Sequence, residues 1–158
     1  MAVAGDDGAP VTDARGERFG HLDFRAAEHI EVVLVGGHAV RIARTHFQGM
    51  AAGPELRLTT RGDEVFLGRH VTTIDGIDIG PAVAVARDGR GAFQALVVGG
   101  GGESGPLAVP FAFVREVTAH IILEPSEQEV RDAQREARAL PGVAGALRRA
   151  ARRAPPQR

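Results

Sequence analysis

The sequence predicts a mainly β protein in which one small barrel-like unit is used twice in tandem and is followed by a C-terminal α-helix. Three observations lead to this fold class. Short apolar runs separated by glycine-rich turns recur about every ten residues in the first 124 positions, which is typical of barrels and sandwiches. A ten-residue segment recurs 60 positions later. Helical spacing of apolar residues begins only after position 125.

The recurring segment opens each predicted unit. Residues 11–20 read VTDARGERFG and residues 71–80 read VTTIDGIDIG, so that Val, Thr and both glycines coincide without a gap. Because similarity at a fixed offset indicates repeated architecture, residues 11–67 are assigned to a first unit and residues 68–124 to a second. Residues 1–10 are expected to be a flexible N-terminal segment.

Both units continue with the same order of apolar runs. The runs lie at 30–35, 40–42 and 56–58 in the first unit and at 93–98, 107–109 and 121–123 in the second. Their length, their β-branched content and the glycines between them are those of short strands. We therefore expect strands, and no helix before about residue 126.

Four glycines are predicted to shape the two units. Gly16 and Gly76 fall in turn-like dipeptides, where a positive φ is favoured. Gly20 and Gly80 fall in the strand after each turn, where an interior glycine marks a bulge or a sharp bend that lets a small barrel close. All four are assigned structural roles.

The C-terminal part is predicted to begin with a helix over residues 125–141. A capping box starts at Ser126, and apolar residues then share one face until a Pro-Gly step ends the helix. Residues 143–154 are compatible with a second short helix. The preferred interpretation of residues 142–158 is a solvated or disordered Arg-rich tail.

The segments around the four glycines resemble the opening of the PRC-barrel family, where a turn of the form Asp-x-Gly-x-x-Ile-Gly leads into the first strands. The second unit matches better, with DGIDIG at 75–80, LVVGG at 96–100 and Val-Pro at 109–110. The first unit has GERFGHLD at 16–23 but Ile-Ala at 42–43 in place of Val-Pro. The resemblance implies a small β-barrel that serves as a non-catalytic docking module.

Composition excludes several classes of protein. The chain has no cysteine, which excludes disulfides, thiolate metal sites and cysteine nucleophiles. No run of 18 apolar residues occurs, and the first ten residues lack the features of a secretory signal. All 19 basic residues are arginine, which indicates a GC-rich genome. A bacterial-type protein in the cytoplasm is therefore expected.

Charge is distributed unevenly along the chain. Residues 1–136 hold all 20 acidic residues and 13 of the 19 arginines, a net charge of −7, whereas the remaining residues hold the other six arginines. Such asymmetry indicates a basic segment with an acidic partner, which is either another molecule or the acidic body of the protein itself. The candidate partner-binding residues are Arg148, Arg149, Arg152 and Arg153.

Catalytic and cofactor motifs are weak. Residues 100–105 satisfy GxGxxG, but a proline and a strand follow instead of the helix that would meet a pyrophosphate. Ser104 and His120 are a distant hydrolase hypothesis without a convincing third group. Six histidines are scattered without metal-ligand spacing. No catalytic, cofactor-binding or metal-binding residue is assigned.

The sequence thus favours a non-catalytic binding or adaptor protein. It would dock onto another protein or associate with itself as a homo-oligomer. The alternative is an RNA- or ribosome-associated factor that uses the Arg-rich tail. Against RNA, no aromatic residue lies among these arginines to stack a base.

Overall fold

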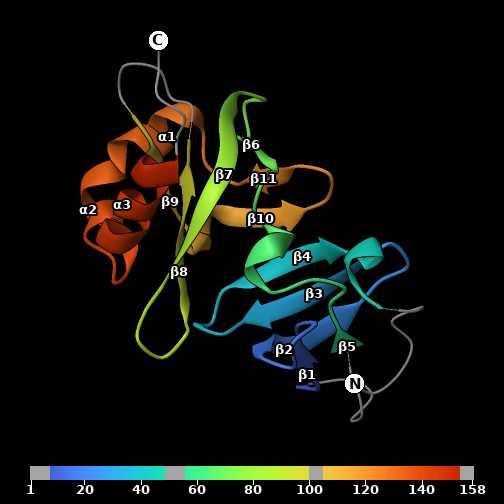
Figure 1. The fold of residues 1–158 in the computed structure, drawn as a ribbon. Coiled ribbons are helices and arrows are strands. Elements are labelled where there is room, and N and C mark those ends of the chain that lie inside the picture. Colours follow the sequence, from blue (N-terminus) through green and yellow to red (C-terminus); the bar gives the residue numbers. More distant parts are fainter. Residues whose placement is uncertain (1–7, 49–55, 100–104, 154–158) are drawn as a thin grey trace.

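Residues 8–48, 56–99 and 105–153 are described by the structure, a computed structural model (Figure 1). The strands are β1 (Pro10–Thr12), β2 (Arg18–Arg25), β3 (His29–Leu34), β4 (Ala39–Ala43), β5 (Leu56–Arg57), β6 (His70–Thr72), β7 (Asp78–Arg87), β8 (Phe93–Val98), β9 (Leu107–Pro110), β10 (Val114–Val117) and β11 (Ile121–Leu123). The helices are α1 (Glu127–Asp132), α2 (Gln134–Arg138) and α3 (Val143–Arg153). The predicted class, mainly β with helix at the C-terminal end, is confirmed.

The strands form one sheet in the order β5-β1-β2-β3-β4-β10-β11-β6-β7-β8-β9. We call strands β1 to β5 the first half and strands β6 to β11 the second half, with residues 58–69 as the segment between them. The two halves meet where β4 pairs in parallel with β10, through Arg41 with Glu116 and Ile42 with Val117. In the described part of the chain, pairing runs from β5 to β9 and does not return. The expected barrel is therefore not seen as a closed ring of paired strands, and the structure has one continuous sheet instead.

The two segments that resemble each other in sequence form the same kind of turn. The N–H of Asp13 donates to the carbonyl of Glu17 (2.8 Å), and the N–H of Thr73 donates to the carbonyl of Ile77 (2.9 Å). In each turn the first side chain also accepts from the last residue, since Glu17 N–H donates to Asp13 Oδ1 (3.0 Å) and Ile77 N–H to Thr73 Oγ1 (3.2 Å).

The strand pairing after the two turns also corresponds. Leu22 of β2 lies opposite Val32 of β3, and Ala82 of β7 lies opposite Val98 of β8, each followed by a register shift. The strands before the turns, β1 and β6, pair in parallel with β5 and β11 respectively. Both halves thus use one pairing scheme, while the tandem repeat itself stays a prediction from the sequence.

The four glycines lie at places where a side chain would not fit well. Gly16 and Gly76 have φ of +84° and +80°, a region that favours glycine. Register shifts occur where β1 and β6 pair with the strands that hold Gly20 and Gly80. A Cβ on either of these two residues would overlap a backbone carbonyl oxygen of the adjacent segment.

Four buried phenylalanines lie at the centre of the main core. Phe19 comes from β2, Phe66 from the segment between the halves, Phe93 from β8 and Phe111 from the turn after β9. Contacting ring centroids are 5.0 to 6.1 Å apart, mostly edge to face, the arrangement that aromatic rings prefer. Because the rings come from both halves, the halves share one core.

The segment between the halves is bonded to both of them. The N–H of Gly62 donates to Asp13 Oδ2 (3.1 Å), and Arg87 donates through Nε (2.9 Å) and Nη2 (2.6 Å) to Asp63 Oδ1. The Arg87 guanidinium also lies 3.9 Å from the centroid of the Phe93 ring, a cation–π contact. Burial alone would raise the pKa of Asp13, but three backbone N–H donors outweigh it and lower that pKa.

Arg69 connects the same segment to turns of both halves. Its guanidinium donates from Nε to the carbonyl of Val65 (2.6 Å) and from Nη1 to the carbonyl of Thr118 (2.9 Å). Its Nη2 lies 3.3 Å from Nδ1 of His46. Partial burial and the Arg69 charge lower the pKa of His46, so a neutral imidazole accepts this hydrogen bond.

The predicted helix over residues 125–141 is divided into α1 and α2. Its capping box is present, since the Ser126 hydroxyl accepts from the N–H of Glu129 (3.2 Å). The helix is interrupted at Ala133, which is the C-cap of α1 and the N-cap of α2. Gln134 accepts from the N–H and donates to the carbonyl of Ala108, both at 2.8 Å, which fixes the chain along the edge strand β9.

One other expectation needs correction. Single turns of 3-10 helix lie at Arg44–His46, Asp63–Val65 and Phe111–Phe113, so the absence of any helix before residue 126 holds only for α-helix within the described ranges. Each turn lets the chain change direction after a strand or a loop. In addition, none of the helices in the described ranges is long and apolar enough to cross a membrane.

Candidate functional site

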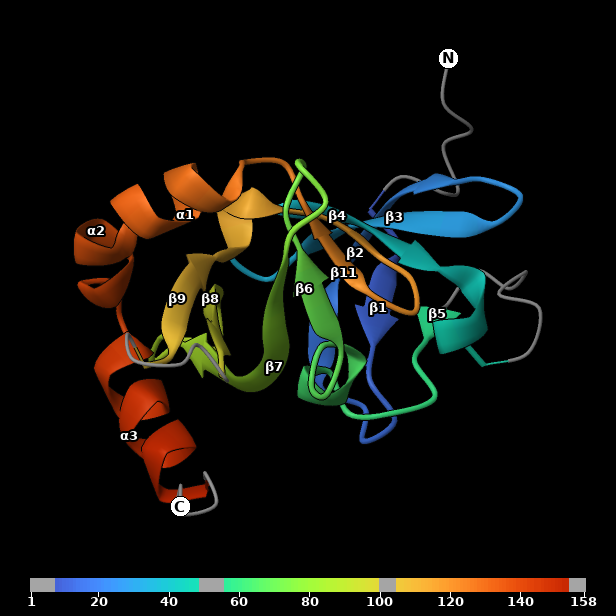
Figure 2. The ribbon, with the colours of Figure 1, turned by 90° about the horizontal axis from the view of Figure 1, so that it is seen from above.

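The predicted arginines lie on helix α3, which packs against the sheet and is not a solvated tail. Its inward side consists of small apolar residues that meet small residues on β7 and β8, in a cluster that continues to β9 (Figure 2). The helix contributes Val143, Ala146 and Ala150, and the strands contribute Ala84, Ala86, Ala95, Val97 and Ala108. Small side chains let a helix approach a sheet closely and still exclude water. The tail interpretation is therefore wrong for Val143–Arg153.

The outward side of α3 is basic. Arg148, Arg149 and Arg152 are exposed, and Arg153 is the last residue of the helix, with its side chain outside the described part. We call Arg148, Arg149 and Arg152 the basic face. No described side chain forms an ion pair or a hydrogen bond with these three guanidinium groups.

Two of the guanidinium groups lie close to Gly145. A Cβ on Gly145 would lie 3.5 Å from Arg149 Nη1 and 3.8 Å from Arg148 Nη2. Both side chains therefore extend back over the same glycine, toward the start of the helix. Arginines in the last turns also interact favourably with the helix dipole, which gives them a structural role. That interaction does not explain why two like charges lie beside each other.

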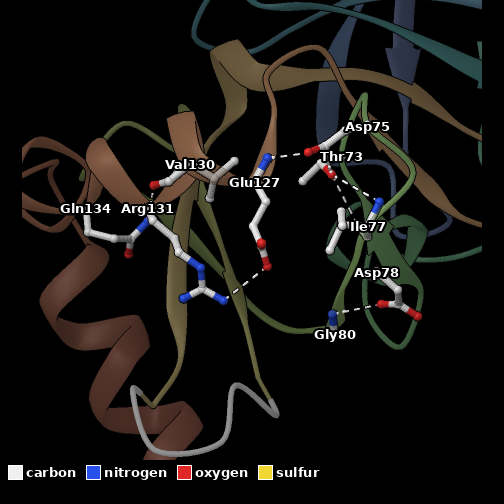
Figure 3. A network of polar contacts seen from close by, with 9 residues as sticks. All are labelled: Thr73, Asp75, Ile77, Asp78, Gly80, Glu127, Val130, Arg131 and Gln134. Carbon is white, nitrogen blue, oxygen red and sulfur yellow. Dashed lines mark hydrogen bonds and ion pairs between the residues drawn. The ribbon is translucent and has the colours of Figure 1, made fainter.

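The start of the helical layer is attached to the turn between β6 and β7. Asp75 Oδ1 accepts a hydrogen bond from the N–H of Glu127 (3.3 Å), as Figure 3 shows. The Thr73 hydroxyl donates to the same carboxylate and holds the pKa of Asp75 below its ordinary value. Glu127 in turn pairs with Arg131 (3.2 Å). The turn and α1 thus form one bonded unit.

The same turn carries two exposed isoleucines. Ile74 and Ile77 are 60% and 40% exposed. Asp75 and Asp78 lie in the same segment, Glu124 precedes the Pro125 carbonyl that accepts from Ile74 N–H, and Glu127 and Glu129 lie in the first turn of α1, to which Asp75 is bonded. We call residues 74–78 with these glutamates the acidic turn. It was not predicted from the sequence. The available signal was the difference between the two matched segments, because the first turn has Ala14 and Glu17 at the positions of the isoleucines.

A shallow depression of 270 Å³ lies where the halves meet. Its charged lining residues are Glu31, Arg41, Arg115 and Glu124, and Glu31 pairs with Arg41 at 3.1 Å. The positive and negative charges are balanced. The lining offers neither an apolar pocket nor a nucleophile beside a base, which are the features expected of a small-molecule or catalytic site.

The weak catalytic hypotheses gain no support from the described residues. His120 is exposed in the turn between β10 and β11, and its N–H is bonded to the Thr118 hydroxyl (3.3 Å). Ser104 and the GxGxxG segment lie outside the described part of the chain. In residues 8–48, 56–99 and 105–153, no group of three or more His, Asp or Glu side chains is placed to hold a metal ion.

Two surfaces therefore stand out, the basic face of α3 and the acidic turn. Comparison with known proteins does not indicate a role for either surface, because no family model and no curated protein matches the sequence. The resemblance to the PRC-barrel family accordingly stays a prediction from the quoted motifs.

Proposed function

We propose that this protein is a non-catalytic binding protein that docks an acidic protein surface on the basic face of α3. The observation that carries the proposal is the geometry of this face. Three exposed arginines without a described partner are fixed on a helix whose other side is buried. A packed helix presents its charges with little loss of backbone freedom on binding, which favours affinity.

An acidic partner agrees with the way the arginines are arranged. Arg148 and Arg149 lie close enough to repel each other, and a carboxylate between them would relieve that repulsion and accept charge-assisted hydrogen bonds. The protein's own acidic residues do not fill this role among the described side chains. An external carboxylate-rich surface fits the face better than the intramolecular one.

RNA is the alternative ligand, and the composition of the helix favours protein over RNA. Single-stranded RNA is bound by basic grooves that include aromatic side chains for stacking. Helix α3 has no aromatic residue. The docking role also agrees with what the PRC-barrel resemblance implies, and both that family and a cytoplasmic location stay predictions.

The test is a binding measurement with two defined probes, an oligo-glutamate peptide and a single-stranded RNA oligonucleotide. In fluorescence anisotropy at low salt, replacement of Arg148, Arg149 and Arg152 by Gln should weaken peptide binding by about tenfold or more, since exposed ion pairs contribute roughly 0.5 kcal/mol each. The control replaces the exposed Arg15, Arg18 and Arg57 by Gln, which changes net charge equally.

The control variant should bind the peptide as the natural chain does. Equal losses in both variants would show that net charge alone attracts the peptide and would contradict the proposal. Stronger binding of RNA than of the peptide, lost in the α3 variant only, would favour the RNA alternative.

A further inference from the structure

We infer that the acidic surface recognised by the basic face of α3 is the acidic turn of a second copy of this chain. This inference rests on the proposed function, because it identifies the partner of the same face. It assigns a role to Ile74 and Ile77, whose side chains are 60% and 40% exposed. The association would be head to tail, with the acidic turn of one copy on helix α3 of the next.

The fold does not require isoleucine in this turn. The turn before β2 has the same hydrogen bonds, with Asp13 and Glu17 in the places of Thr73 and Ile77. There, the position of Ile74 is occupied by Ala14, and a charged residue replaces Ile77. The molecule thus contains an internal control, and two exposed apolar side chains at one turn tip are typical of a contact surface.

The two surfaces are complementary in charge. The acidic turn holds five carboxylates, and two of them are bonded to a basic side chain (Glu127 to Arg131, Asp78 to His70). Asp75, Glu124 and Glu129 have no ion pair among the described side chains. The three guanidinium groups of the basic face likewise have no ion pair among the described side chains, so the two surfaces have opposite charge.

Hydrogen bonds hold the acidic turn in place before any contact forms. The N–H of Ile74 donates to the carbonyl of Pro125 (3.0 Å), and Gly76 N–H donates to the carbonyl of Thr73 (2.9 Å). Asp75 is bonded to the start of α1. A fixed turn loses little conformational entropy when it binds, and its isoleucines can contact the aliphatic stems of arginines on the partner helix.

The positions of the two surfaces favour a second copy over an intramolecular contact. In Figures 1 and 2 the turn between β6 and β7 lies beside the start of α1, whereas α3 lies apart from it on the sheet. Both surfaces are therefore open in the same molecule. A contact between unlike surfaces leaves one of each free at the ends of every assembly, which leads to rings or chains.

The experiment is analytical ultracentrifugation of the full chain over a range of concentrations at low salt and at 1 M salt. The natural chain should form dimers and larger species reversibly at low salt. It should become monomeric at 1 M salt, where the screening length is about 3 Å. A chain that stays monomeric at every concentration at low salt would overturn the inference.

Two variants test the surfaces separately. Arg148→Glu with Arg149→Glu and Arg152→Glu removes the basic face, and Ile74→Ser with Ile77→Ser removes the apolar tip of the acidic turn. Each variant alone should be monomeric. An equimolar mixture should form a 1:1 complex and nothing larger, because each variant keeps the one surface that the other lacks. Failure of the mixture to associate would overturn a head-to-tail contact.

A control separates specific contact from general attraction. Charge reversal at Arg15, Arg18 and Arg57 should leave association unchanged, and its loss in this variant would also overturn the inference. Failure of this inference can be distinguished from failure of the proposed function. A chain that binds oligo-glutamate through α3 but does not self-associate would retain the docking role and refute only the second copy as partner. Circular dichroism of each variant establishes that it is folded.

Discussion

Gly80 illustrates how strongly one residue of this sheet is constrained. Its φ of +113° lies in a region that side chains rarely adopt, and a Cβ would overlap the carbonyl oxygen of Gly99. Its N–H donates to Asp78 Oδ1 at 2.8 Å. Both conformation and space therefore require glycine at this position, where β7 leaves the acidic turn.

Gly80→Ala should lower the free energy of unfolding by about 3 kcal/mol or more, because backbone strain of roughly 1 to 3 kcal/mol adds to the overlap with a carbonyl oxygen. The measurement is urea denaturation followed by circular dichroism. Gly89→Ala is the matched control, since Gly89 lacks a positive φ and has no neighbour within 4 Å of its Cβ position. Similar effects of the two substitutions would contradict this account.

Residues of this kind could be predicted because turn chemistry is local. Gly16 and Gly76 follow from the dipeptides that contain them, and the capping box at Ser126 follows from four consecutive residues. Ile74 and Ile77 could not be recognised as a surface feature from local pattern. In an alternating strand an isoleucine usually faces the core, and only the folded turn shows that these two face solvent.

At the scale of the element, α3 shows how an alanine-rich helix is mistaken for a tail. Its buried residues are Val143, Ala146 and Ala150, which give a weak apolar pattern beside five arginines in the segment that follows residue 147. The matching surface on β7 and β8 is equally rich in alanine and lies more than 40 residues earlier. The sequence of either surface alone does not indicate that the two pack together.

Truncation after Pro141 should reduce stability strongly and to the same extent at low salt and at 1 M salt. The loss removes apolar burial on both sides of the interface, on the order of 3 kcal/mol or more, and apolar contacts are not screened by salt. Thermal unfolding at the two salt concentrations measures it. A small loss that disappears in 1 M salt would instead show that charges attach the helix.

The matched control keeps the helix and removes its charges. Replacement of Arg148, Arg149 and Arg152 by Gln should change the melting temperature little, because exposed charges contribute at most about 1 kcal/mol each. A large loss of stability in this variant would place the arginines in the structural framework of the helix and would weaken their assignment as a binding face.

Other elements show the same limit of sequence information. The strands with apolar runs were predicted because their residues alone indicate β structure, whereas β10, which reads VREV, is short and half polar. The break at Ala133 is followed by bonds between Gln134 and Ala108, 26 residues apart in sequence. Closure of the sheet into a barrel is not detected among the described strands, and the pairing of β4 with β10 is a non-local property that the sequence pattern does not contain.

At the scale of the whole molecule, the two halves are expected to fold as one unit. Phe19 from the first half and Phe93 and Phe111 from the second surround Phe66, which belongs to the segment between them. The Asp63–Arg87 ion pair crosses the same boundary. Neither half can bury its apolar residues without the other.

The full chain should therefore unfold in a single transition that is the same by circular dichroism and by NMR. A fragment of residues 1–68 should show no cooperative transition, because Phe19 and Phe66 would lose their partners. Two separate transitions in the full chain, or a folded fragment, would contradict a shared core. The equimolar mixture with residues 69–158 is the control, since complementation would restore the transition.

The backbone hydrogen bond that joins Phe93 to Val35 has a kinetic consequence. The N–H of Phe93, in the second half, donates to the carbonyl of Val35 (2.8 Å) in the first half, and the N–H of Val35 donates to the carbonyl of Phe19 (3.0 Å). Exchange of the Phe93 amide hydrogen with deuterium requires the halves to separate, and so requires global opening. The isotope exchange rate at this one site therefore reports the free energy that keeps the entire molecule closed.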